Sequence, residues 1–114
     1  MAPGGADPAP STPTAYVWTY RVRPEWRDRF RAAYGPAGAW AEFFRGSPAY
    51  LRTDLLENAD GFVTIDWFAD PDSRGALVAA HQADYAALDR EWSQATTDET
   101  FIGAFAAVPG APAA

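Results

Sequence analysis

Apolar and polar residues alternate along this chain in a pattern that predicts four strands and three helical segments. β-Branched and aromatic residues, which favour half-buried strands, are concentrated in residues 15–22, 50–57, 61–69 and 99–108. Apolar residues recur with helical spacing in residues 24–34, 37–45 and 71–92. The β-α-β-β-α-β order predicts an α+β fold of the ferredoxin-like split β-α-β type, with both helical regions on one face of an antiparallel four-stranded sheet.

The helix predicted over residues 71–92 carries one apolar stripe, which should face the sheet. Asp70 is a suitable N-cap residue and Pro71 suits the first turn, so we expect the helix to begin there. The stripe includes the only histidine of the chain, four residues before a tyrosine. Its members, spaced three or four residues apart, are Leu77, His81, Tyr85, Leu88 and Trp92.

Both faces of the predicted sheet are largely apolar. In the third strand, the two alternating sets are Phe62, Thr64, Asp66 and Phe68 on one face and Val63, Ile65 and Trp67 on the other. Helices can cover only one of these faces, and the other would not remain in water. We therefore expect a homodimer that packs sheet against sheet, which is a dimeric α+β barrel.

The two ends of the chain differ from this domain in composition. Residues 1–14 contain four prolines, and residues 109–114 contain only proline, glycine and alanine. Such segments bury too little apolar surface to offset the entropy lost on ordering. We expect two disordered tails around one domain at residues 15–108.

The composition excludes several kinds of site. The absence of cysteine and lysine removes thiolate nucleophiles, cysteine-rich metal sites and Schiff-base chemistry. One histidine is no metal-ligand cluster, and no dinucleotide or phosphate fingerprint is present, so we expect neither a metal nor an organic cofactor. The net charge of −6 argues against nucleic acid and anionic membranes as partners. Without an apolar run of ~20 residues or a signal-peptide core, the expected location is cytoplasmic.

Three polar residues in apolar surroundings are candidates for catalysis. His81 could take a proton from a phenol, or it could be a structural histidine bonded to a carbonyl or to Asp66. Tyr85 could orient a substrate, or its hydroxyl could simply lie at the rim of the core. Asp66 lies in mid-strand among aromatic residues, where a carboxylate is either paired, here with Arg52 or Arg21, or has a raised pKa.

Seventeen aromatic residues are a surplus for a domain of this size. Flat rings suit the walls of a pocket for a polycyclic phenolic ligand, although the same residues also form ordinary cores. The candidates for such substrate-binding walls are Trp18, Tyr20, Trp40, Phe44 and Trp67.

Several segments together resemble a known family. They are residues 18–24 (WTYRVRP), 30–36, 50–51, 64–67 (TIDW), 85–89 (YAALD) and 99–105. Over most of residues 16–105 the chain resembles the antibiotic biosynthesis monooxygenase family of dimeric α+β barrel proteins. The resemblance implies a homodimer, an aromatic or polyketide-like substrate and oxygen chemistry without a cofactor. The same family includes haem-degrading enzymes, polyketide cyclases and members with no known reaction.

The chain departs from two groups within this family. Haem-degrading members have an asparagine on the first strand and a tryptophan and histidine on the second helix; here that strand has no asparagine, and Pro71 stands ten residues before His81. The quinone-forming members use tryptophan, asparagine and tyrosine, and the only asparagine here, Asn58, falls in a predicted turn. A polyketide cyclase of this fold has a histidine and a tyrosine that His81 and Tyr85 resemble. We expect a cofactor-independent monooxygenase, with a polyketide cyclase or a non-catalytic binding protein as alternatives.

Overall fold

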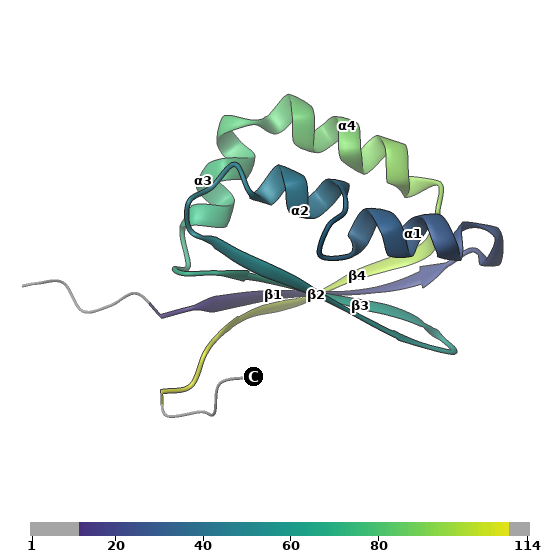
Figure 1. Cartoon of the computed structure of the whole chain (residues 1–114), viewed down its shortest axis with the longest axis horizontal. Coiled ribbons are helices and arrows are strands. Elements are labelled where there is room, and N and C mark those ends of the chain that lie inside the picture. Colours follow the sequence, from purple (N-terminus) through teal and green to yellow (C-terminus); the bar gives the residue numbers. More distant parts are fainter. Residues whose placement is uncertain (1–11, 110–114) are drawn as a thin grey trace, which may run out of the picture.

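Four antiparallel strands form one sheet, and the helices lie together on one side of it (Figure 1). The computed structural model describes residues 12–109. The strands are β1 (Thr14–Val22), β2 (Tyr50–Asn58), β3 (Gly61–Phe68) and β4 (Thr96–Ala106), in the spatial order β2-β3-β1-β4. The helical elements are η1 (Pro24–Trp26), α1 (Arg27–Tyr34), α2 (Ala39–Phe44), α3 (Ser73–Ala80) and α4 (Gln82–Ser93). The predicted α+β, ferredoxin-like arrangement is confirmed.

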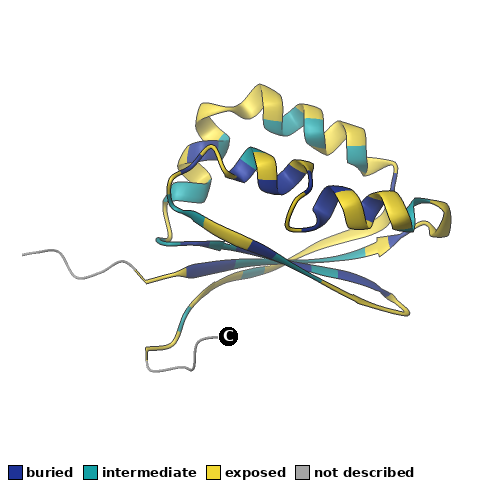
Figure 2. Ribbon diagram, viewed as in Figure 1, coloured by how far each residue is buried: buried dark blue, intermediate teal, exposed yellow. Residues whose placement is uncertain are grey.

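The core fills the space between the helices and the inner face of the sheet, the face toward the helices. Phe30, Phe44 and Phe68 are its largest inaccessible side chains, and they come from α1, α2 and β3. Figure 2 shows buried segments on α1, α2, β1 and β3 but none on α4, and α4 has no buried residue. The helix α4 is therefore the outer part of the helical layer, and its half-buried Tyr85, Leu88 and Trp92 pack against the core.

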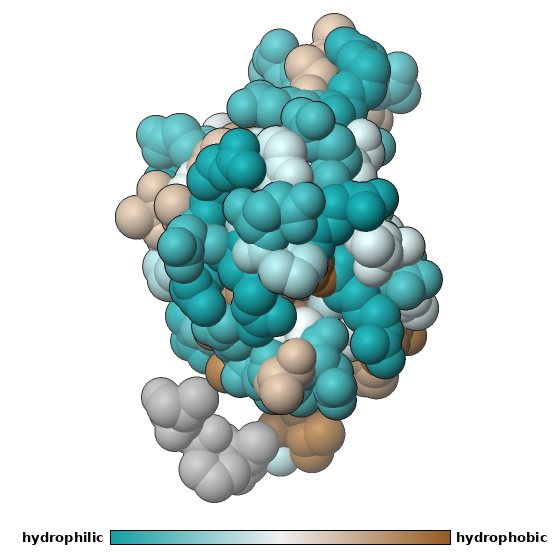
Figure 3. Space-filling view, turned by 90° about the vertical axis from the view of Figure 1, so that its right-hand side faces the viewer, coloured by the Kyte–Doolittle hydropathy of each residue, from teal (hydrophilic) through white to brown (hydrophobic). Residues whose placement is uncertain are grey.

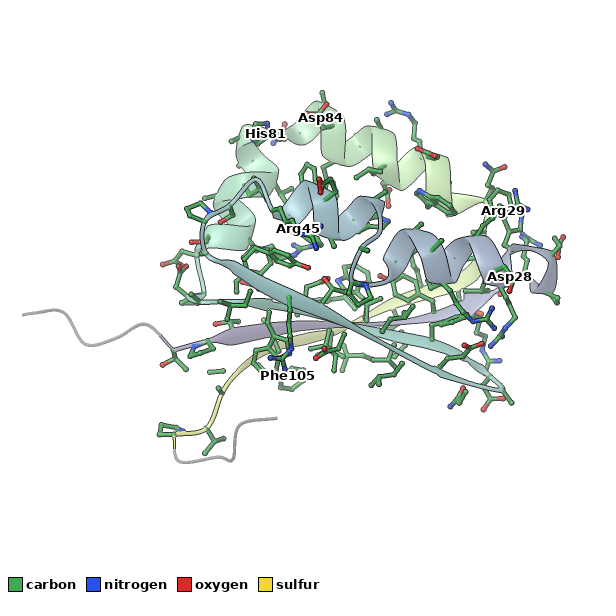
Figure 4. The ribbon with its side chains drawn as sticks, in the orientation of Figure 1. Asp28, Arg29, Arg45, His81, Asp84 and Phe105 are labelled. Atoms are coloured by element: carbon green, nitrogen blue, oxygen red, sulfur yellow. The ribbon has the colours of Figure 1, made fainter. Side chains whose placement is uncertain are left out.

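The prediction of one continuous helix over residues 71–92 is wrong. At His81 the backbone has φ −129° and ψ 43°, which ends α3 and starts α4. The break lets α3 rise from the end of the sheet while α4 runs across the helical layer (Figure 1). The apolar stripe does not pass through the break: Leu77 is buried and Tyr85 half-buried, whereas His81 is exposed and points away from the sheet (Figure 4).

Local hydrogen bonds explain where the helix α3 begins. The carboxylate of Asp70 accepts the backbone N–H groups of Asp72 and Ser73 at 2.9 and 2.8 Å and the Ser73 hydroxyl at 2.7 Å. These bonds fix a turn before the helix, so α3 starts at Ser73 and not at Pro71. The predicted turn between β2 and β3 is formed in a similar way, with the Asn58 side chain accepting two backbone N–H groups.

Two strands begin earlier than the sequence predicts. The last strand is expected from residue 99, but β4 already begins at Thr96 and pairs with β1. Thr14, assigned to the N-terminal tail, is the buried first residue of β1. The remaining parts of the predicted tails, residues 1–11 and 110–114, lie outside the described residues. No helix in the described range is long and apolar enough to cross a membrane.

Candidate functional site

A narrow cavity lies between the inner face of the sheet and the helices α1, α2 and α4. It encloses about 460 Å³ of free space with its mouth, of which about 50 Å³ admits the centre of a water molecule. The lining residues are Trp18, Tyr20, Tyr34, Trp40, Phe44, Thr64, Asp66, Tyr85, Asp89 and Glu99.

The cavity brings together most of the residues that the sequence singled out. Six of the eight predicted site residues line it: Trp18, Tyr20, Trp40, Phe44, Asp66 and Tyr85. The other two, His81 and Trp67, lie elsewhere. The sequence did not indicate Tyr34, Thr64, Asp89 or Glu99 as site residues.

Asp66 lies at the floor of the cavity, with 6% of the residue exposed. The hydroxyl of Thr53, which faces it across β2 and β3, donates to its Oδ1 at 2.6 Å. Tyr50 Oη is 2.7 Å from the same hydroxyl. Because Thr53 has a single hydroxyl proton and gives it to Asp66, the Tyr50 O–H donates to Thr53. The three side chains form a directed hydrogen-bond chain from the half-buried phenol to the buried carboxylate.

The surroundings of Asp66 bring the pKa of its carboxyl close to neutral pH. Burial raises the pKa of the Asp66 carboxyl to about 6, while the Thr53 hydrogen bond and the Arg74 charge oppose that rise and Asp54 adds to it. The Arg74 guanidinium lies 5.1 Å from the centre of the Tyr16 ring and 5.5 Å from that of Phe44. The carboxylate is therefore desolvated, yet it is ionised at neutral pH.

The predicted pairing of Asp66 with an arginine on the neighbouring strands is wrong. Arg52 lies 3.2 Å from Asp54, and Arg21 lies 4.0 Å from Asp98. Both arginines occupy strand positions that face away from the helices, because side chains alternate along a strand. The alternative drawn from the sequence, a raised pKa, describes Asp66 correctly.

Two hydrogen-bond donors in the cavity wall are free. Thr64 donates to Tyr20 Oη at 3.4 Å, which leaves the Tyr20 O–H available. Burial raises the pKa of Tyr20 far above its usual value, so the phenol stays protonated. Trp40 is nine-tenths buried, and within residues 12–109 its indole N–H makes no hydrogen bond of normal geometry, although it interacts with Tyr34 and opposes the burial-raised pKa of that phenol. Both donors belong to the cavity that contains Asp66.

The mouth of the cavity is acidic. Asp89 on α4 and Glu99 on β4 are the lining residues most exposed to solvent. Burial, and after it the charge of Asp89, raises the pKa of Glu99. No arginine or histidine is present in the lining formed by the described residues.

Trp67 and His81 are placed outside the cavity for different reasons. Trp67 is adjacent to Asp66 in β3, so it faces the other side of the sheet, where its indole N–H donates to Asp54 at 3.3 Å. His81 lies at the junction of α3 and α4 on the solvent side of the helical layer (Figure 4). The structure therefore does not support the expectation that His81 lines a pocket.

Comparison with known proteins identifies a relative in fold. No family model matches the chain, and no curated protein matches it. Among solved structures, it is similar to SnoaB, a cofactor-independent oxygenase from Streptomyces nogalater, with a TM-score of 0.64 and 20% sequence identity. The match covers 90% of this chain and 100% of SnoaB. This likeness shows the fold.

Proposed function

We propose that this chain is a cofactor-independent monooxygenase for a small aromatic, polyketide-like substrate, with Asp66 as the general base. The observation that carries the proposal is a buried carboxylate in an aromatic cavity, with a pKa raised to about 6. A base with a pKa near the working pH is both ionised and strong enough to accept a proton. The similarity in fold to an oxygenase supports the proposal.

The first step is transfer of a phenolic or benzylic proton to Asp66. The carboxylate becomes neutral as the substrate becomes an anion, so the charge in the cavity moves but does not grow. The Tyr20 O–H and the Trp40 N–H, which have no acceptor in the cavity wall, stabilise the anion by donating to its oxygen. Tyr85 and the other rings of the wall hold the substrate.

The second step is reaction of the electron-rich anion with dioxygen. Conversion of a CH₂ group to a carbonyl supplies the four electrons that reduce O₂, with one oxygen atom entering the product and the other leaving as water. The stoichiometry is complete without a flavin or a metal. The proton held by Asp66 returns to the departing oxygen, which then leaves as water, and the Thr53 hydroxyl again donates to the ionised carboxylate.

Oxygen consumption with 1,8-dihydroxyanthrone, in buffer free of flavin and added metal, tests the proposal. Asp66→Asn keeps the shape and the Thr53 bond and should lower the rate by about 10²–10⁴-fold, the usual contribution of a positioned base. Asp98→Asn is the matched control, because it removes an exposed carboxylate from the opposite face of the sheet. An Asp66→Asn rate equal to that of the control would reject Asp66 as the base.

The same assay separates the alternatives. A polyketide cyclase uses the same base and donors for an aldol-type closure, so it would convert a polyketide-like substrate without consuming oxygen. A non-catalytic binding protein would bind the anthrone and turn over nothing.

We also propose that the protein acts as a homodimer that buries the outer face of the sheet, the face away from the helices. Two side chains on this face, Leu56 and Phe105, are 54% and 50% exposed, and Phe105 points away from the helical layer (Figure 4). Figure 3 shows hydrophobic residues gathered toward the sheet side of the molecule, whereas the helical side is mostly hydrophilic. A second copy of the same face would cover this surface.

Light scattering at micromolar concentration tests the dimer. The wild type should have twice the chain mass, with an interface of about 1,600 Å² in total. Phe105→Glu should give monomers because it places a charge in the interface. Ala87→Glu, at an exposed position of α4, should leave the mass unchanged. A monomeric wild type would refute the proposal.

A further inference from the structure

The cavity combines aromatic walls with acidic groups and contains no cationic side chain from the described residues. We propose that its ligand carries an organic cation, a protonated amine or a quaternary ammonium group, which binds between the aromatic walls and the carboxylates of the mouth. As a statement about the substrate of the oxygenase, this inference rests on the proposed function. As a statement about binding, it can be tested without any reaction.

The rings in the wall are arranged around a space and not in one stack. Six of the ten lining residues are aromatic. The Trp40 ring meets that of Tyr85 at 72° with centres 5.5 Å apart, and that of Tyr34 at 42° with centres 5.8 Å apart. Rings set at such angles around a small volume can direct their electron-rich faces at one point, which is how aromatic cages bind alkylammonium groups.

Several rings already have cations, among them Phe44 of the cavity, whose ring centre lies 5.5 Å from Arg74. Arg29 lies 3.7 Å from the centre of the Trp26 ring, and Arg52 lies 5.5 Å from that of Trp67. Within residues 12–109, the two tryptophans of the cavity, Trp18 and Trp40, have no arginine over their rings. A cationic group of the ligand would lie over Trp18 and Trp40 as arginine lies over Trp26 and Trp67.

The charges favour a cation and oppose an anion. Asp66 lies at the floor, and Asp89 and Glu99 lie at the mouth. Burial raises the pKa of Glu99, and the charge of Asp89 raises it further. A cation between the two mouth carboxylates would remove their repulsion. A carboxylate or phosphate ligand would instead meet three acidic groups in the wall, and the one positive charge that acts on Asp66, Arg74, is not among the lining residues.

The buried indole N–H of Trp40 adds a second requirement. A buried donor without an acceptor is rare in folded proteins, and a ligand or water that accepts from it restores the bond. The ligand class is therefore an amine that also carries an oxygen acceptor, such as a hydroxyl or a carbonyl. An amine-bearing phenol meets both requirements and offers Asp66 a proton.

Choline and its neutral isostere 3,3-dimethylbutan-1-ol are the probes, since they share their shape and hydroxyl and differ in charge. Titration of the full chain is followed by NMR of the indole N–H signals. Choline should shift the signals of Trp18 and Trp40, while Trp26 and Trp67, outside the cavity, serve as internal controls. Choline should bind about tenfold tighter than the isostere. Equal binding of the two probes, or no shift at Trp40 with choline, would overturn the proposal.

Charge variants locate the cation. Glu99→Gln and Asp89→Asn should each weaken choline binding about two- to fivefold and leave the isostere unaffected. Asp98→Asn removes the same charge from the residue beside Glu99, on the opposite face of β4, and should change neither probe. If Asp98→Asn weakens choline as much as Glu99→Gln does, the cation is only attracted to an acidic surface and the proposal fails. Asp66→Asn tests the base and the cation site separately. If this variant loses oxygen consumption but still binds choline, both proposals are supported.

Discussion

Replacing Asp66 by asparagine should stabilise the protein at neutral pH. Asp66 is 6% exposed, and burial raises the pKa of its carboxyl from 3.8 to about 6. Above pH 6 the folded state therefore contains a desolvated negative charge, which lowers the free energy of unfolding. Asparagine has nearly the same shape and can still accept the Thr53 hydrogen bond through its amide oxygen. The substitution removes the charge and replaces one carboxylate oxygen by an NH₂ group of nearly the same size.

The sign and size follow from proton linkage. Between pH 3.8 and about 6 the folded chain holds the Asp66 proton and the unfolded chain has released it, so stability falls as the pH rises through this window. A shift of about two units corresponds to ~3 kcal/mol in the free energy of unfolding. Asp66→Asn should match the wild type near pH 3.5 and exceed it by about that amount at pH 8. For a domain of this size, the melting temperature should rise by roughly 10 °C or more.

Urea unfolding of both proteins at pH 3.5, 5, 6.5 and 8 measures this difference. Both are compared at the same protein concentration, because a dimer makes stability depend on concentration. Other titrating groups are common to both proteins, so their contributions to the difference in stability cancel. One of them is Glu57, whose pKa is lowered to about 2 by hydrogen bonds from Arg31 and Arg27. Asp98→Asn should show no such trend. A difference between Asp66→Asn and wild type that does not change with pH would refute the desolvated carboxylate and the base built on it.

Two further variants probe the surroundings of the site. Thr53→Val removes the donor to Asp66 Oδ1 and should raise the pKa of Asp66 by about one unit, as ¹³C NMR of the carboxyl can follow, whereas Thr53→Ser should restore it. His81→Phe alters an exposed side chain outside the cavity, so turnover should be unchanged and the free energy of unfolding should change by no more than about 0.5 kcal/mol. Loss of turnover in folded His81→Phe would reinstate the catalytic role that its spacing suggested.

The fold was predictable because each of its strands carries its own signal. Buried residues alternate with half-buried ones along β3 as the pattern predicts, with Phe62, Thr64, Asp66 and Phe68 on the inner face. Gly103 lies where the pairing of β4 with β1 shifts register, and glycine is common at such irregularities. Alternation with a period of two is a property of one strand alone. It therefore identifies the two faces of a strand even when the partner strand is not known.

The site was less predictable because it depends on register and on helix direction. Thr53 bonds Asp66 while its neighbour Arg52 faces the other way, and only the pairing of β2 with β3 decides between them. No proline or glycine marks the break at His81 in the sequence. The apolar spacing therefore predicts one continuous helix across it. Asp89 and Glu99 come from α4 and β4, and only the packed structure shows that they share a cavity with Asp66.

The size of the cavity limits what can enter this conformation. Clefts for drug-sized ligands usually measure about 300–1,000 Å³, far more than the 50 Å³ open to the centre of a water molecule here. A polycyclic substrate therefore requires one wall to move. The inner face of the sheet, α1 and α2 carry the buried aromatic core, whereas α4 has no buried residue and is joined to α3 through the non-helical His81. Of the three helices that line the cavity, α4 alone has no buried residue, so moving it uncovers less buried apolar surface than moving α1 or α2. His81, which its spacing suggested as the base, lies instead at the break between α3 and α4.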